Sequence, residues 1–167
     1  TLTAADASAG AGFGTAVAIS GNTLAIGAPR RPNFDAPLQS GAVYLFQRTA
    51  SGWAQTQLLV HRQYEAGEVA PTDPSNFGGA VALSGDRLIV KNRPEFPYTS
   101  FEPLAYLYER RGVWAPVAGL ASPSALASET LFLSDALAVV DAFESVRYGP
   151  SLSFDLPDLW TLPPRAQ

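Results

Sequence analysis

The chain of 167 residues contains no cysteine and no methionine, and its single histidine is His61. The lack of cysteine excludes disulfides and thiolate metal sites. A hydrolase triad would have to use His61 itself, and no Gly-x-Ser-x-Gly sequence is present to supply its nucleophile. We interpret His61 as an exposed residue at the end of a strand. We therefore expect no enzymatic activity, no catalytic residue, no metal site and no cofactor.

Charged residues are scarce, and basic clusters are missing. They make up 16% of the chain, the net charge is -4, and the 11 basic residues are scattered singly or in short pairs. This pattern disfavours a nucleic-acid partner, which requires a basic patch. No apolar run approaches the roughly 20 residues that span a bilayer. The hydrophobic content of 47% predicts a packed core, and a chain that starts at Thr1 suggests processing or excision.

Three related units follow one another along a single domain, residues 1–167, at about residues 7–64, 71–120 and 126–167. The sequence from Phe13 to Ile26 recurs 64 residues later, from Phe77 to Val90, and a weaker copy follows in the third unit. A fixed period of this kind is the signature of a repeat architecture.

The second half of each unit contains one tryptophan. The spacings from the hairpin serine to the tryptophan are 33, 30 and 26 residues, which places one repeat position at Trp53, Trp114 and Trp160. We expect these side chains to pack between sheets, because a tryptophan buries a large apolar area. A set that stacks on a sugar or a peptide is the alternative.

Each unit is predicted to form four short strands. In the first strand of the first unit, Val17 and Ile19 alternate with the small residues Ala16 and Ala18, which is the period of a β-strand. Gly21-Asn22, and its counterpart in the second unit, predict two-residue hairpin turns. Because both faces of the strand are apolar, we expect each sheet to be covered on both faces, as in a propeller blade.

The residues Phe13-Gly14, Gly27-Ala28-Pro29 and Gly41 to Phe46 resemble the FG-GAP repeat, which builds the β-propellers of integrin α chains and of many bacterial surface proteins. The second unit keeps Phe77-Gly78 but has Lys91 where Gly-Ala-Pro should begin, and the third lacks the Phe-Gly pair. The resemblance implies an all-β fold of three four-stranded antiparallel blades, forming a partial or oligomer-completed β-propeller. It also implies an extracytoplasmic location, whether secreted, periplasmic or on the cell surface.

Many members of this family bind calcium in an Asp-x-Asp-x-Asp-Gly loop between the first two strands. Here that loop is replaced by short turns such as Ser20-Gly21-Asn22. A two-residue turn cannot supply the six to eight oxygen ligands that calcium needs. We therefore expect no calcium at the usual position of the family.

Aromatic residues in the long loops are the candidates for an interface. Exposed aromatics clustered at loop tips mark binding surfaces, and the alternative is that these loops fold back over the sheet. The candidates are Phe34, Phe96, Tyr98 and Phe101. Scattered carboxylates are interpreted as solvating or turn-forming groups; they include Asp6, Asp35, Asp73 and Asp141.

The most consistent function is a protein–protein interaction or structural module, expected to be an accessory subunit of a larger extracytoplasmic assembly. The alternative is carbohydrate binding through the loop aromatics. Closed propellers have four to eight blades, so three blades indicate an excised part of a propeller, a six-bladed ring of two copies, or a different protein that covers the open faces. Thr1 to Asp6 resemble an outer strand, and we expect this strand to complete a final blade, either within the chain or in a partner.

Overall fold

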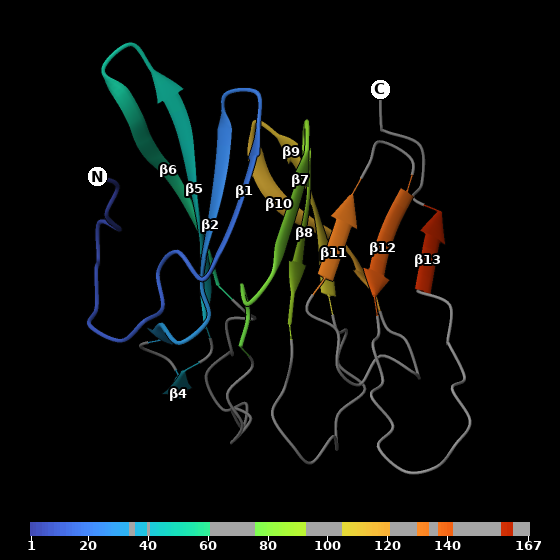
Figure 1. Ribbon diagram of the computed structural model, residues 1–167, viewed down its shortest axis with the longest axis horizontal. Coiled ribbons are helices and arrows are strands. Elements are labelled where there is room, and N and C mark those ends of the chain that lie inside the picture. The colour runs from blue at the N-terminus through green and yellow to red at the C-terminus, as the bar shows by residue number, and fades with distance from the viewer. Residues whose placement is uncertain are drawn as a thin grey trace, which may run out of the picture.

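The computed structural model describes residues 1–33, 36–39, 41–60, 76–92, 105–120, 130–133, 137–141 and 158–161. All regular structure in these residues is β-strand, arranged as successive antiparallel sheets (Figure 1). Within these ranges there is no helix of the length and apolarity needed to cross a membrane. The predicted all-β class is confirmed.

The first sheet has four strands in the order β1-β2-β5-β6. Its strands are β1 (Ala16–Ser20), β2 (Thr23–Ala28), β5 (Ala42–Thr49) and β6 (Gly52–Val60). The predicted hairpin is confirmed, since Ser20 pairs with Thr23 and Gly21 has a φ of 56°. Glycine tolerates this positive φ at the first central position of the turn.

The second sheet repeats this arrangement. Its order is β7-β8-β9-β10, with strands β7 (Val81–Ser84), β8 (Arg87–Lys91), β9 (Ala105–Arg111) and β10 (Val113–Leu120). The turn is again a two-residue hairpin with a glycine, Gly85, at a φ of 56°. Two four-stranded antiparallel sheets therefore stand where the first two sequence units predict them.

The third sheet contains three strands among the described residues, in the order β11-β12-β13. They are β11 (Thr130–Leu133), β12 (Leu137–Asp141) and β13 (Asp158–Thr161). Trp160 pairs with Ala138 of β12, so it lies on the third strand, whereas Trp53 and Trp114 lie on fourth strands. The predicted equivalence of the three tryptophans is wrong for Trp160, because the shortest spacing, 26 residues, brings it one strand further inward.

A small hairpin interrupts the loop predicted between β2 and β5. It pairs β3 (Pro32–Asn33) with β4 (Ala36–Gln39). The N-terminal residues 1–15 form turns and irregular structure instead of the outer strand predicted from Thr1 to Asp6. They lie beside the first sheet, on the side away from the second sheet (Figure 1).

The innermost strands of the three sheets lie side by side. Strand β1 packs against β7, and β7 packs against β11 (Figure 1). One core cluster joins the facing sides of the first two sheets, and its members are Ala25, Val43, Leu45, Leu59, Phe77, Leu88, Val90, Tyr108 and Trp114. The predicted packing role between sheets is confirmed for Trp114, which is buried in this cluster.

Polar contacts join the same two sheets at both ends of the strand order. The side-chain amide of Gln57 accepts a hydrogen bond from the backbone N–H of Trp114 at 2.9 Å and donates one to the backbone carbonyl of Trp114 at 2.8 Å. Near the innermost strands, the Gly85 N–H donates to the Ser20 hydroxyl at 3.0 Å. The two sheets are thus fixed against one another at their inner and outer strands.

Candidate interaction surface

Glycine backbones meet where the second sheet contacts the first. Gly27 lies directly under the carbonyl of Gly78, and a Cβ at position 27 would overlap that oxygen. Gly41 forms a parallel β-bridge with Phe77, and a Cβ there would also overlap the Phe77 backbone. The Phe-Gly pair of one unit therefore docks on the glycines of the preceding unit, and only residues without a side chain permit this approach.

Aromatic rings and aliphatic side chains fill the rest of this contact. Phe77 is fully buried, with its ring centroid 6.3 Å from that of Tyr106 and 6.4 Å from that of Tyr108. On the innermost strand, Val81 and Leu83 pack against the shared core cluster. Burial raises the pKa of Tyr108 well above its usual value.

The first sheet carries the equivalent residues, 64 positions earlier in the sequence, on its other face. Phe13 repeats the aromatic arrangement, with its ring 5.4 Å from Tyr44 and 6.4 Å from Phe46. The equivalents of Val81 and Leu83 are nevertheless open to solvent, since Val17 is 58% exposed and Ile19 is 61% exposed. No described residue of the chain covers these two side chains as the first sheet covers the second.

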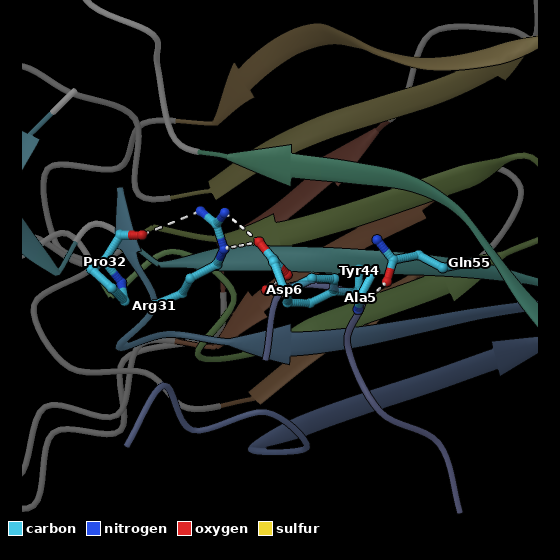
Figure 2. Close-up of polar contacts among 6 residues, drawn as sticks. All are labelled: Ala5, Asp6, Arg31, Pro32, Tyr44 and Gln55. Atoms are coloured by element: carbon cyan, nitrogen blue, oxygen red, sulfur yellow. Dashed lines mark hydrogen bonds and ion pairs between the residues drawn. The ribbon is translucent and has the colours of Figure 1, made fainter. Parts of the chain in front are cut away.

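The N-terminal segment covers the outer part of this face through a polar cluster (Figure 2). The Asp6 carboxylate accepts hydrogen bonds from Arg31 Nε at 3.0 Å and from the Tyr44 hydroxyl at 2.7 Å. The Ala5 N–H donates to the Gln55 side chain at 3.0 Å, and Arg31 also donates to the Pro32 carbonyl. Apolar contacts from Leu2 and Ala4 complete this attachment.

The electrostatics of this cluster favour an ionised Asp6. Partial burial alone would raise the pKa of Asp6, but hydrogen bonds from Tyr44 and Arg31, together with the Arg31 charge, lower the pKa below its usual value. Burial and the hydrogen bond to Asp6 raise the pKa of Tyr44 to about 12. Asp6 is thus an anchoring group, and its interpretation as a solvating or turn-forming carboxylate is wrong.

A second ionic contact lies inside the second sheet. Arg87, which is 1% exposed, pairs across the strands with Glu109, and Nε of Arg87 donates to Oε1 of Glu109 at 3.1 Å. Hydrogen bonds from Arg111 and Arg87 lower the pKa of Glu109 despite its burial. The same position of the first sheet holds two uncharged residues, and the Thr23 hydroxyl and the Gln47 side-chain amide share a hydrogen bond of 2.8 Å.

The structure does not place the predicted interface residues. Phe34, Phe96, Tyr98 and Phe101 lie outside the described residues, as do His61, Asp35 and Asp73. Trp53 is half-buried and packs beside Leu58 against the first sheet's own apolar face, together with the N-terminal segment. Among the described residues, no three His, Cys, Asp or Glu side chains gather into a potential metal site.

The open face was missed in the sequence because the alternation of Val17 with Ala16 predicts apolar faces without saying which face has a neighbour. The signal that could have found it is the Phe-Gly pair. In this structure that pair marks the side of a sheet that the preceding unit covers. A Cβ added at Gly78 would overlap the Ala42 carbonyl, whereas a Cβ added at Gly14 would have nothing within 4 Å.

The comparison with family models matches residues 1–46, which include both the open Phe-Gly pair and the Gly-Ala-Pro segment, to the FG-GAP repeat. The first 46 residues are thus similar to one FG-GAP repeat. FG-GAP repeats are typical of β-propeller interaction modules and of extracellular domains, and the match confirms the resemblance drawn from Phe13-Gly14 and Gly27-Ala28-Pro29. The comparisons with curated proteins and with solved structures give no match.

Proposed function

We propose that this chain is a non-enzymatic protein–protein interaction module built from three β-propeller blades, acting as an accessory subunit of an extracytoplasmic assembly. The observation that carries the proposal is the open apolar face of the first sheet. Val17 and Ile19 are more than half exposed, while the equivalent Val81 and Leu83 pack against a neighbouring sheet. Large exposed apolar side chains at a position built for packing mark an interaction surface.

The arrangement of the sheets supports the propeller part of the proposal. The first strands of successive sheets lie side by side, as blades do around a common axis. The alternative of carbohydrate binding remains a prediction, because its aromatic residues lie outside the described part of the chain. No observation on the described residues favours it over protein binding.

The test is the native mass of the tagged chain purified from its own source, with identification of any copurifying protein. We expect a stoichiometric partner protein that is lost in the double variant V17E/I19E. The matched control is Val113→Glu, because Val113 is 66% exposed on the outermost strand of the second sheet and lies away from the open face. A chain that purifies alone, or a partner retained by V17E/I19E, would contradict the proposal.

A further inference from the structure

Residues 1–6 hold one carboxylate between two donors of the first unit. Arg31 donates to Oδ2 of Asp6 from both Nε and Nη2, and the Tyr44 hydroxyl donates to Oδ1 at 2.7 Å (Figure 2). Both oxygens of the carboxylate are therefore bound. Because hydrogen bonds to an ionised group are the strong ones, Arg31 and Tyr44 together form a carboxylate-binding site.

The receiving side of this contact is held in place by the first unit itself. The backbone of Arg31 donates to the Ala28 carbonyl and accepts from the Gly41 N–H, both at 3.1 Å, and Nη1 of Arg31 donates to the Pro32 carbonyl. Tyr44 lies within β5 and pairs with strands on both sides. The site is thus preorganised without residues 1–6, which lowers the cost of binding a ligand there.

An empty site would leave a buried cation. The side chain of Arg31 is only 7% exposed, and its charge is paired with that of Asp6. A buried charge that loses its partner is strongly unfavourable. The site therefore favours the capture of another carboxylate whenever Asp6 leaves.

The segment that now fills the site is weakly attached. Residues 1–6 contain no strand, and Ala4 has the one buried side chain among them. Their hydrogen bonds to described residues after residue 6 come from Asp6 and from the Ala5 N–H, which donates to Gln55 at 3.0 Å. A segment with so few buried contacts opens locally at a small fraction of the free energy of global unfolding.

The apolar surface beside the site extends beyond what residues 1–6 cover. Leu2 and Ala4 pack on this surface at alternate positions of the segment, yet the apolar side chains beneath them stay half-buried, among them Trp53, Leu58 and Val60. A segment that also covered these side chains would bury more apolar area than residues 1–6 do. This gain offsets the advantage that tethering gives to the internal segment.

We propose that Arg31, Tyr44 and Gln55 form a binding site for an extended acidic segment of another protein, and that residues 1–6 occupy this site as an internal competitor. The internal segment displays the chemistry of the ligand: an aspartate, a small residue two positions before it, and an apolar residue four positions before it. The site lies beside the open apolar face, and the inference does not rest on the function proposed for that face.

The binding experiment uses the full chain with Asp6→Ala, which removes the internal carboxylate and leaves the receiving groups in place. The probe is a fluorescently labelled peptide with the sequence of residues 1–8, and fluorescence anisotropy follows its binding. We expect the peptide to bind this variant at least about tenfold more tightly than wild type, in which the tethered segment competes. Adding Tyr44→Phe to the variant should weaken binding about fivefold, because one hydrogen bond is lost. The matched control is the same peptide with Asp6→Asn, which should bind at least about tenfold more weakly.

A second measurement shows whether the peptide and the internal segment share the site. Because the chain has no cysteine, Ala4→Cys in the full chain reports the opening of residues 1–6 by thiol labelling. Unlabelled peptide should accelerate this labelling, by about tenfold at ten times its Kd for the Asp6→Ala chain. Val113→Cys should label at a constant rate. The Asp6→Asn peptide and sodium acetate at the same concentration should leave the labelling of Ala4→Cys unchanged.

Absence of saturable binding to the Asp6→Ala chain would overturn the proposal, as would equal affinity for the two peptides. A peptide that binds without accelerating the labelling of Ala4→Cys would also overturn it, because that peptide would bind elsewhere. Acceleration by acetate would assign the site to small anions and reject a protein segment as its ligand. If V17E/I19E loses a native partner while the peptide fails to bind, the proposed function stands and only this site is rejected.

Discussion

The first and second sheets have similar residues at equivalent positions, but these residues differ in what covers them. The first sheet covers Phe77, Val81 and Leu83, while the equivalent residues Phe13, Val17 and Ile19 line a face that, among the described residues, the N-terminal segment covers only in part. One aromatic contact is retained in both sheets, since the rings of Phe13 and Phe46 and those of Phe77 and Tyr108 both meet edge-on with centroids 6.4 Å apart. Each repeat thus supplies only one of the two surfaces of a contact between sheets. Whether the residues of that surface are buried depends on the presence of a neighbouring sheet.

The boundary between the second and third units shows the complementary case. Lys91 stands where the first unit has Gly27, and the third unit has no Phe-Gly pair to dock there. Both halves of the glycine contact are thus missing at this boundary, although β11 still packs against β7 and β8. A glycine at position 91 would have no Phe-Gly backbone to accept, and it would only weaken the strand.

The largest expected effect comes from the two phenylalanines of the repeat. Phe77→Ala should lower the free energy of unfolding by about 4 kcal/mol, because a fully buried ring leaves a cavity between two sheets. Phe13→Ala should cost only about 1.5 kcal/mol, because its ring is half-buried. Urea denaturation followed by tryptophan fluorescence measures both, and equal losses would remove the distinction between the two faces.

The next effect distinguishes the ionic pair of the second sheet from the neutral pair of the first. Glu109→Ala should cost about 3 kcal/mol, because it removes the carboxylate that neutralises the buried Arg87. Gln47→Ala removes the hydrogen bonds of an uncharged amide, among them the one shared with Thr23, and should cost about 1 kcal/mol. Thermal unfolding of both variants checks the order, and a larger loss for Gln47→Ala would contradict it.

A smaller effect compares two valines at one repeat position. Val81→Ala should cost about 1 kcal/mol, because Val81 packs against the shared core. Val17→Ala should change the free energy of unfolding by less than about 0.5 kcal/mol in the isolated chain, because Val17 is mostly exposed. If the open face is covered by a partner in the preparation, the two losses will instead be similar.

The smallest effect concerns the anchor of the N-terminal segment. Asp6→Asn should cost about 1 kcal/mol at neutral pH, because the side chain is 38% exposed and water screens its pair with Arg31. Since the folded-state pKa of Asp6 lies below the unfolded one, this stability is present above about pH 5 and is lost as the pH falls through the folded-state pKa. The difference in the free energy of unfolding between wild type and variant should therefore narrow as the pH falls from 7 to 3, which denaturation curves measure.

Tyr44→Phe is the control for this pH dependence. It removes one hydrogen bond to Asp6 but leaves Arg31 in place, so a smaller loss with the same direction of pH dependence is expected. A gap between wild type and Asp6→Asn that stays constant down to pH 3 would show that Asp6 is not an ionised anchor.

The local structure of the first two sheets could be predicted from the sequence. Alternation of apolar residues fixed their strands, and Gly21 and Gly85 fixed the hairpin turns, because both signals act between near neighbours in the chain. The Asp6 cluster could not be predicted, since it joins residues 25 and 38 positions apart. The strand that carries Trp160 and the small β3–β4 hairpin likewise depend on strand register and loop geometry. A periodic sequence pattern does not report either of these.

The Asp6 cluster also has a mechanical consequence. A pulling force applied at Thr1 loads the bonds from Asp6 to Arg31 and Tyr44 before it reaches β1, because the irregular residues 7–15 lie between them. Those bonds hold the segment to Arg31, which lies in the loop after β2, and to Tyr44 within β5. The Asp6 cluster should therefore bear a force on the N-terminal segment before that force reaches the hairpin of β1 and β2.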